Sequence, residues 1–258
     1  MSATAPSRAL PFRINIDEAF RFVARDRDWP AKLGLGGLFS FLSFTIVGYV
    51  LAQGYLLVFT ERVARAEPQP LPEWKDFGEL LRKGLIVTVV HLVYALPLLL
   101  LFLLIFGGNI ALIAALDATS SSGSSDLAVG AVWAFLILAL VGNGLLFLLG
   151  IAFFALFPAA HAQLVLHDAD LAAAFDLRAI FAFIGRYRAQ YAVAVLLFYA
   201  ASTLLSYVGY LLCCVGIFVT TFYSQLFLYH MVGQFCWHER MTWLAQSGRS
   251  GAMGEGYA

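Results

Sequence analysis

The longest stretch without a charged side chain spans residues 189–238 and reads AQYAVAVLLFYAASTLLSYVGYLLCCVGIFVTTFYSQLFLYHMVGQFCWH. Its 50 residues contain no Asp, Glu, Lys or Arg. A helix that crosses the hydrocarbon layer of a bilayer needs about 20 consecutive apolar residues, so this stretch is too long for a single crossing. We therefore predict two spans, 190–208 and 212–233, that meet near Gly209 and Tyr210.

Three further stretches lack charged residues: 33–60, 84–116 and 127–166 contain 28, 33 and 40 residues. Charged residues make up only 12% of the 258-residue chain, about half of the usual share of ~25%. The pattern predicts an all-α fold, a polytopic helical integral membrane protein with about six membrane-embedded segments. Because the net charge is zero, there is no basic excess to hold a nucleic acid.

The two middle stretches predict one membrane span each. Residues 85–106 form the first, and Pro97 in its middle is expected to kink the helix. Residues 107–127 begin with two glycines and contain a Ser-rich tract, which predicts an external loop. Residues 128–166 form the second span, which ends in a cytoplasmic extension.

Stretch 33–60 allows two interpretations. As one helix it is about 42 Å long, more than the ~30 Å hydrocarbon layer, so it forms either one tilted span or two short arms that turn near Gly48 and Tyr49. Lys and Arg accumulate on the cytoplasmic side of membranes, and all 16 lie before residue 33, in 62–83, in 178–188 or after residue 239. A single span divides them between two sides, whereas a short hairpin at 31–65, crossing or re-entrant, places them on one. We favour the hairpin, with both termini cytoplasmic.

An internal repeat favours the same interpretation. Shifting the chain by 161 residues aligns 16–60 with 177–221 and pairs two Val-Gly-Tyr tripeptides, 47–49 and 208–210. A parallel repeat requires an even number of spans between its copies, which only the two-arm hairpin supplies. Apolar composition alone also produces such matches, so the repeat is a prediction that needs the structure.

Three segments are expected to lie along the membrane surface, at 14–28, 71–83 and 171–188. The first and third carry apolar residues at helical spacing between arginines, as interfacial amphipathic helices do. The second begins within a run of three alternating prolines, Pro68, Pro70 and Pro72, which hold the chain extended. The Gly-rich tail at 244–258 is expected to be flexible.

Two runs of sequence resemble a known family. Residues 71–85 read LPEWKDFGELLRKGL directly before a span, and residues 172–180 read AAAFDLRAI shortly after Pro158. With these runs the chain resembles domain-of-unknown-function family 4013, polytopic membrane proteins of bacteria and archaea. The resemblance covers about residues 17–236, and the LPEW-x-DFG run is its most specific part. It implies a multi-pass membrane protein, which we expect in the bacterial inner (plasma) membrane, and it carries over no activity, substrate or catalytic residue.

Glu73, Trp74, Asp76 and Phe77 in this run are candidates for an interfacial docking surface. The aromatic rings suit the headgroup boundary, and the charged groups suit a cytoplasmic partner or an anionic lipid. The alternative is an interfacial segment whose charges are solvated or paired with one another.

Ionisable or strongly polar residues within the spans are few. No carboxylate lies in an apolar stretch, which argues against ion-coupled transport. Single membrane histidines usually bond a neighbouring helix, but facing imidazoles also ligate haem. Large amides bridge helices or line a polar path. The candidates are His91, His161 and His230 for a cofactor, and Gln53, Asn143 and Gln225 for a polar lining.

The sequence contains no catalytic constellation and no Cys/His spacing typical of zinc, so we expect no enzyme, no metal site and no cofactor. The three cysteines, Cys213, Cys214 and Cys236, are interpreted as apolar packing residues. The leading hypothesis is a non-enzymatic scaffold or accessory component that binds membrane lipids, a membrane-protein partner or a second copy of itself. The alternative is a permease-like transporter for a neutral or hydrophobic solute, and a weaker alternative is a haem-binding redox subunit.

Overall fold

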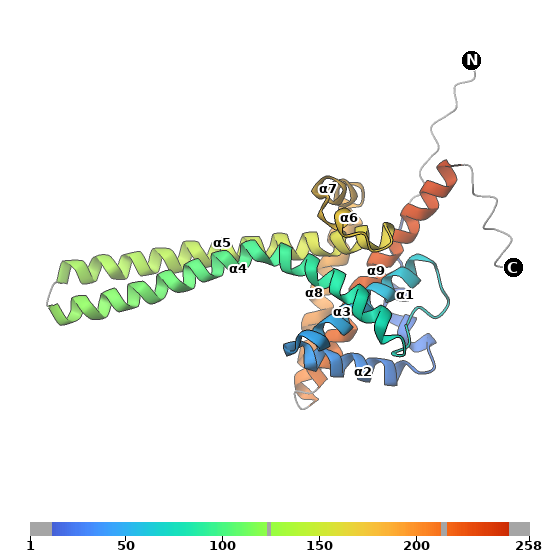
Figure 1. Ribbon diagram of the computed structural model, residues 1–258, viewed down its shortest axis with the longest axis horizontal. Helices are drawn as coiled ribbons and strands as arrows, with labels where there is room; N and C mark the ends of the chain where they lie inside the picture. The colour runs from blue at the N-terminus through green and yellow to red at the C-terminus, as the bar shows by residue number, and fades with distance from the viewer. Residues whose placement is uncertain (1–11, 123–124, 213–215, 248–258) are drawn as a thin grey trace, which may run out of the picture. The chain divides into compact units, whose positions relative to one another are not determined.

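A computed structural model describes residues 12–122, 125–212 and 216–247 of the chain (Figure 1). Every regular element in these residues is a helix, and none is a strand, which confirms the predicted all-α fold class. The chain divides into two compact units. The core unit contains residues 1–88 and 158–258, and the hairpin unit contains residues 89–157.

The core unit begins with a short amphipathic segment. Asn15 caps α1 (Ile16–Arg21), because its side-chain oxygen accepts the Glu18 N–H at 3.0 Å. The Glu18 carboxylate in turn accepts a hydrogen bond from Asn15 Nδ2 at 3.2 Å. The turn η1 (Phe22–Arg25) follows directly. Ala19, Phe22 and Val23 are buried, so the apolar face of this segment packs against the other helices of the core unit, including α9.

Two helices occupy the region predicted as the first hairpin. α2 (Trp29–Phe41) carries Pro30 in its first turn, where a missing N–H costs nothing. The turn η2 (Leu42–Phe44) leads to α3 (Ile46–Ala64), and the hydroxyl of its cap, Thr45, accepts the Gly48 N–H at 3.1 Å. The chain therefore turns at residues 42–45 and not at Gly48-Tyr49 as the sequence suggested, because Thr45 supplies the cap.

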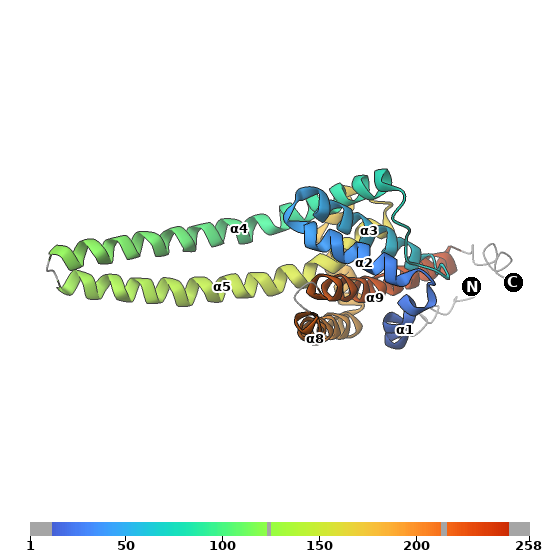
Figure 2. The ribbon, with the colours of Figure 1, turned by 90° about the horizontal axis from the view of Figure 1, so that it is seen from below.

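α9 (Gly216–Gln246) is the central helix of the core unit and packs against α2, α3 and α8. α3 runs parallel to α9 and α2 runs antiparallel to it, so α2 and α3 form an antiparallel pair (Figure 2). The contacts that establish these directions are Tyr55–Phe222 and Val63–Gly233 for α3, and Gly36–Phe222 and Phe41–Phe218 for α2.

The second half of the core unit repeats the order of short and long helices. α6 (Leu171–Phe175) and α7 (Leu177–Arg186) precede α8 (Arg188–Leu211), which lies antiparallel to α9. The two Val-Gly-Tyr tripeptides, however, lie on different elements, at the start of α3 and near the end of α8. The ungapped alignment places the end of α8 on the start of α3, because α8 has 24 residues and α2, the helix aligned with its first part, has only 13. The alignment is therefore wrong beyond the end of α2. A common origin of the two halves stays a prediction.

The hairpin unit consists of the middle parts of two very long helices. α4 (Phe77–Ser122) has 46 residues and α5 (Ser125–Leu166) has 42, about 69 and 63 Å of helix. The two lie side by side in Figures 1 and 2, with Leu138 against Gly108 and Ile105 against Gly142. Only 11% and 6% of their most apolar windows are buried. Their exposed Leu, Ile and Phe side chains suit contact with lipid tails.

The predicted external loop at 107–127 is wrong for its described residues, because α4 continues to Ser122 and α5 begins at Ser125. Residues 110–118 are rich in Ala, Leu and Ile, which favour a helix in this apolar context. Asn109 follows the two glycines and donates from Nδ2 to the Ile105 carbonyl at 2.8 Å. The predicted flexible tail likewise starts too early, since α9 extends to Gln246, and residues 248–258 lie outside the described part.

Among the described residues, four helical segments are long and apolar enough to cross a membrane. They support a multi-pass membrane protein. The predicted count of about six embedded segments stays a prediction, because α2 and α9 are not among these four. The α3 span is 78% buried inside the protein, unlike the others. The four segments are Ile46–Ala64, Phe77–Ala118, Val129–Leu166 and Arg188–Leu211.

All 14 basic residues in the described part of the chain belong to the core unit. Several of them meet around the C-terminal part of α9, which we call the basic end of the core unit. Arg186 pairs with Glu239 at 2.7 Å, and Arg240 donates to the Val165 carbonyl at 3.0 Å. Arg62 precedes Val63, which lies against Gly233. The predicted location of the basic residues on one side of the membrane stays a prediction.

Candidate functional site

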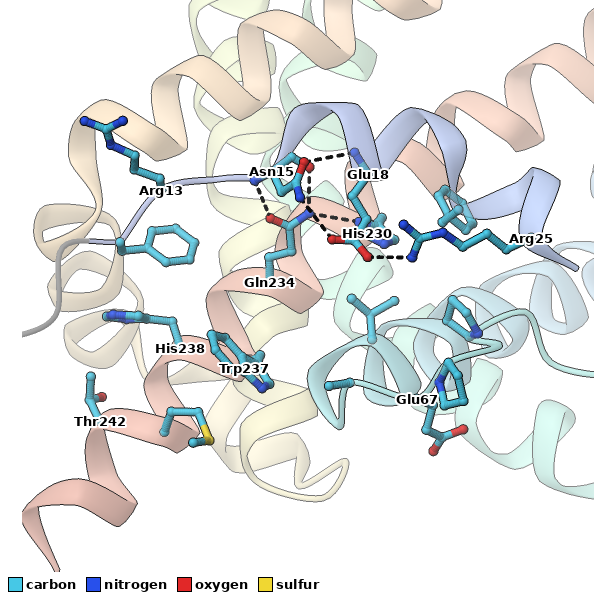
Figure 3. A pocket seen from close by; sticks show the side chains of 17 residues that line it. Arg13, Asn15, Glu18, Arg25, Glu67, His230, Gln234, Trp237, His238 and Thr242 are labelled. Carbon is cyan, nitrogen blue, oxygen red and sulfur yellow. Dashed lines mark hydrogen bonds and ion pairs between the residues drawn. The ribbon is translucent and has the colours of Figure 1, made fainter. Parts of the chain in front are cut away.

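A cavity of about 840 Å³ opens at the basic end of the core unit (Figure 3). Ligand pockets in proteins have volumes of about 300–1,000 Å³. Three segments that are distant in sequence enclose this one: residues 12–25, the loop 66–70 that follows α3, and residues 230–242 of α9. The cavity lies entirely within the core unit.

One wall of the cavity is polar. Gln234 of α9 bonds the Asn15 backbone twice, accepting its N–H at 2.8 Å and donating to its carbonyl at 3.0 Å. Arg25 Nη1 donates to Glu18 Oε1 at 2.8 Å (Figure 3). The Gln234 amide also lies 3.1 Å from His230 Nδ1. These contacts fix α1 on α9 and leave polar groups facing the cavity.

The opposite wall is mainly apolar. Ala66 adopts the left-handed conformation, with φ 56°, directly after α3. The Glu67 N–H donates to the Arg62 carbonyl at 3.1 Å, a hydrogen bond typical of the end of a helix. The chain then changes direction, and Pro68 and Pro70 line the cavity. Trp237, Met241 and Val63 complete this wall. The cavity therefore offers polar and apolar surfaces to one ligand.

The formal charges in the lining balance. Arg13 and Arg25 are opposed by Glu18 and Glu67. Glu67 is also 3.7 Å from Arg62 Nε, while no described carboxylate lies within ion-pair distance of Arg13. A neutral molecule with separated charges matches such a lining better than a simple cation or anion does.

A cluster of ring side chains, Phe12, Tyr187 and His238, packs beside the cavity. The Tyr187 hydroxyl lies 2.8 Å from His238 Nδ1, and the Phe12 ring packs 4.7 Å from the His238 ring. Burial, and then the nearby Glu239 carboxylate, raise the pKa of the Tyr187 hydroxyl, so it stays protonated and able to donate at neutral pH. Arg186 holds Glu239 through two hydrogen bonds of 2.7 and 2.9 Å.

The three candidate histidines occupy different surroundings. His91 lies in the hairpin unit, with its ring 3.6 Å from the Phe157 ring. His161 Nε2 is 3.3 Å from Thr60 Oγ1. His230 stacks on Phe22 at 4.7 Å and lines the cavity. Each thus has helix-packing contacts, and a haem site stays a prediction. The described residues contain no group of three metal-ligating side chains.

The three candidate amides do not line the cavity. Gln53 is buried in α3, and its Oε1 has no hydrogen-bond partner among the described residues. Asn143 is exposed in the hairpin unit and donates to its own Ala139 carbonyl at 2.6 Å. Gln225 is half-buried in α9. A polar path through these three residues stays a prediction.

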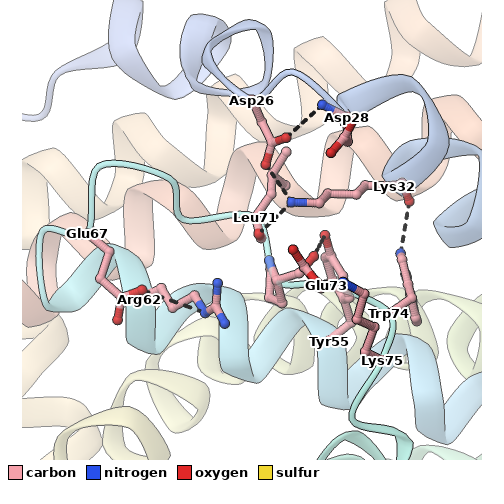
Figure 4. Close-up of polar contacts among 11 residues, drawn as sticks. Asp26, Asp28, Lys32, Tyr55, Arg62, Glu67, Leu71, Glu73, Trp74 and Lys75 are labelled. Atoms are coloured by element: carbon pink, nitrogen blue, oxygen red, sulfur yellow. Dashed lines mark hydrogen bonds and ion pairs between the residues drawn. The ribbon is translucent and has the colours of Figure 1, made fainter.

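The LPEW run connects three helices (Figure 4). Trp74 stacks on Tyr55 of α3 with the ring centroids 4.2 Å apart, and its Nε1 donates to the Lys32 carbonyl of α2 at 3.1 Å. The Tyr55 hydroxyl donates to the Pro72 carbonyl at 3.1 Å. Trp74 is only 8% exposed. It therefore belongs to the core and not to an exposed docking surface.

The other candidates for docking behave differently from Trp74. The Asp76 carboxylate accepts the Glu79 N–H at 3.2 Å at the start of α4, as a helix cap does. Glu73 pairs with Lys75 in solvent, and the Lys75 ammonium lowers the pKa of the Glu73 carboxylate. Phe77 is exposed. Glu73, Asp76 and Phe77 are all exposed, and a docking surface that contains these three residues stays a prediction.

Two buried ion pairs were not expected from the sequence. Lys83 Nζ of α4 contacts Glu61 Oε2 of α3 at 2.5 Å, and Glu79 Oε1 at 2.8 Å. Lys32 Nζ contacts Asp26 Oδ2 at 2.6 Å and donates to the Leu71 carbonyl at 3.1 Å (Figure 4). Both pairs sit at the edges of charge-free stretches, where the sequence gives no indication of their partners.

The cavity was also missed at the sequence level. The Asn15-x-x-Glu18 spacing is a recognisable capping pattern, but its partners Arg25 and Gln234 are brought to it only by the packing of α1 on α9. Of the three cysteines, Cys236 is buried against the Ala162 carbonyl, which fits the predicted packing role. Cys213 and Cys214 lie outside the described residues.

Residues 38–214 match the model of a family described as Protein of unknown function (DUF4013). The match includes α3, the LPEW run and the loop 66–70, but not the segments 12–25 and 230–242 that form the other walls of the cavity. Comparisons with curated proteins and with solved structures gave no match.

Proposed function

This chain belongs to the DUF4013 family, and from that membership and the cavity we propose that it is a non-enzymatic membrane protein that binds a membrane lipid. The four apolar helices support a multi-pass protein. The lipid would be held at the basic end of the core unit, in contact with α1, the loop 66–70 and α9. We place the protein in the bacterial inner membrane.

The observation that carries the proposal is the two-sided lining of the cavity. Arg25, Glu18 and Gln234 offer hydrogen bonds and charge on one wall, while Trp237 and Met241 offer apolar surface on the other. A lipid presents the same two chemistries within one molecule. Trp side chains are also enriched where a protein meets the boundary between apolar and aqueous surroundings.

The distribution of basic residues supports the position of the cavity. Positively charged residues gather on the cytoplasmic side of inner-membrane proteins, and the basic end of the core unit carries both these residues and the cavity. We therefore propose that both termini are cytoplasmic. The cavity then lies at the level of the cytoplasmic headgroups, where a lipid enters it without crossing the bilayer.

The test is native mass spectrometry of the protein purified in a mild detergent. We expect one phospholipid to stay bound after exhaustive detergent exchange. Met241→Trp places a bulky ring in the cavity and should lower the lipid-bound fraction at least about fivefold. Ala245→Trp, one turn further along α9 and outside the lining, is the matched control and should leave that fraction unchanged.

Two results would contradict the proposal. One is a wild-type protein that retains no lipid under conditions in which it stays folded by circular dichroism. The other is lipid retention that Met241→Trp and Ala245→Trp lower equally, because the retained lipid would then be bound elsewhere on the apolar surface. A stoichiometric protein partner in the same spectra, without lipid, would favour a scaffold for membrane proteins instead.

A further inference from the structure

We propose that the cavity selects a zwitterionic phospholipid headgroup, a phosphate ester that carries an ammonium group, with the phosphate at Arg25 and the ammonium at Glu18. This inference rests on the proposed lipid binding and names the headgroup. It follows from the geometry of one ion pair, from the charge balance of the lining and from the aromatic surface beside it.

The Arg25–Glu18 pair keeps most of its bonding capacity for a ligand. The two side chains point toward each other in Figure 3, joined by the single 2.8 Å contact from Nη1 to Oε1. Their side chains are 58% and 36% exposed. A guanidinium has five N–H donors and a carboxylate about four acceptor positions, of which Glu18 uses one for Arg25 and one for Asn15 Nδ2. A phosphate can therefore bind the guanidinium, and an ammonium the carboxylate, while the pair stays intact.

The geometry of the pair matches a dipolar headgroup. A phosphate and an ammonium two carbons apart form a short dipole, which lies antiparallel to the Arg25–Glu18 dipole when each charge faces its opposite. Charge-assisted hydrogen bonds of this kind are about twice as strong as neutral ones. The lining also contains one further group of each sign, Arg13 and Glu67, so its formal charges sum to zero. An anionic headgroup would leave the Glu18 carboxylate next to an uncompensated negative charge.

The aromatic surface favours the ammonium end of the headgroup. Trp237 lines the cavity and is 41% exposed, and the faces of aromatic rings attract ammonium groups. Phe22 also borders the cavity, but its ring is buried against His230 and Phe59. The apolar wall of Met241 and the loop prolines then meets the glycerol and acyl part of a lipid.

The test is isothermal titration calorimetry of the full-length protein in detergent with dihexanoyl phosphatidylethanolamine, dihexanoyl phosphatidylglycerol and free phosphoethanolamine. We expect the zwitterionic lipid to bind at least about tenfold more tightly than the anionic lipid. Arg25→Gln should weaken the binding of phosphatidylethanolamine about tenfold. Glu18→Gln should weaken it similarly and strengthen the binding of phosphatidylglycerol, which removes the preference.

A second ion pair on the same helix provides matched controls. Arg21 Nε contacts Asp17 Oδ1 at 2.9 Å, with side chains that are 76% and 71% exposed, and neither residue lines the cavity. Arg21→Gln and Asp17→Asn should change each affinity less than about twofold. The ratio of the two lipid affinities, measured on one sample, does not depend on the fraction of protein that is folded.

The outcomes separate this inference from the proposed function. Equal affinity for both lipids would overturn the inference and leave lipid binding standing. No binding of either lipid would overturn both. If free phosphoethanolamine binds as tightly as the lipid, the headgroup chemistry is supported and the lipid is not the ligand. Identical effects of Arg25→Gln and Arg21→Gln would also overturn the inference.

Discussion

The buried contact between Lys83 and Glu61 allows a quantitative test of the packing of α4 on α3. Their side chains are 10% and 8% exposed, and Nζ lies 2.5 Å from Oε2. Removing one partner of a buried ion pair leaves the other charge uncompensated, which costs about 3–5 kcal/mol. Replacing both partners by apolar residues of similar size is often neutral.

The structure predicts unequal effects of the two single substitutions. Lys83→Met leaves the Glu61 carboxylate buried without its cation, and we expect a loss of about 3 kcal/mol or more in the free energy of unfolding. Glu61→Met leaves Lys83 with Glu79, 2.8 Å away and 43% exposed, so it should cost clearly less. The double variant should be more stable than Lys83→Met alone.

The measurement is equilibrium unfolding of the purified variants in mixed micelles with increasing SDS, followed by tryptophan fluorescence. The double-mutant cycle gives the coupling between the two positions. Glu79→Gln serves as a control, because its partly exposed pair with Lys83 should contribute less than about 1 kcal/mol. A coupling below about 0.5 kcal/mol, or equal losses in all three variants, would refute the buried pair.

Three other predictions follow from the same unit. Trp74→Ala removes the ring stacked on Tyr55 and should cost about 3–5 kcal/mol in the free energy of unfolding, while Trp74→Phe should cost less in the same SDS titration. Gly84→Val should prevent the close approach of α4 to α3, because a Cβ at residue 84 would lie 1.9 Å from the Val50 carbonyl oxygen; monodisperse wild-type-like elution of this variant in gel filtration would contradict that. With the other two cysteines replaced by alanine, the buried Cys236 should react with N-ethylmaleimide only after unfolding in SDS, as mass spectrometry would show.

The sequence was most informative where chemistry is local. The uncharged stretches are long enough to indicate membrane-spanning helices. The all-α class and the apolar segments could therefore be predicted from composition and length. The helix ends depended on single caps that composition does not reveal. Thr45 starts α3 three residues before the expected turn, and residues 107–122 continue as helix where two glycines suggested a loop.

The cavity could not be predicted because its walls are assembled across the chain. Asn15 and Gln234 are separated by 219 residues, and only the packing of α1 on α9 brings them together. The prediction that Trp74 is exposed at the membrane interface was wrong for a related reason. An aromatic residue beside prolines and charges is typical of the membrane interface, whereas here Tyr55 supplies a ring that covers it. Burial of this kind depends on the partner helix and not on the local sequence.

The central claim, that a lipid occupies the cavity at the basic end, is tested most directly by photo-crosslinking. A phosphatidylethanolamine with a diazirine next to the glycerol is added at one equivalent to the detergent-purified protein, illuminated, and mapped by peptide mass spectrometry. We predict adducts concentrated on the peptide that contains Trp237 and Met241. Adducts spread over the exposed apolar surface of the hairpin unit, residues 89–157, with none on that peptide, would contradict the claim.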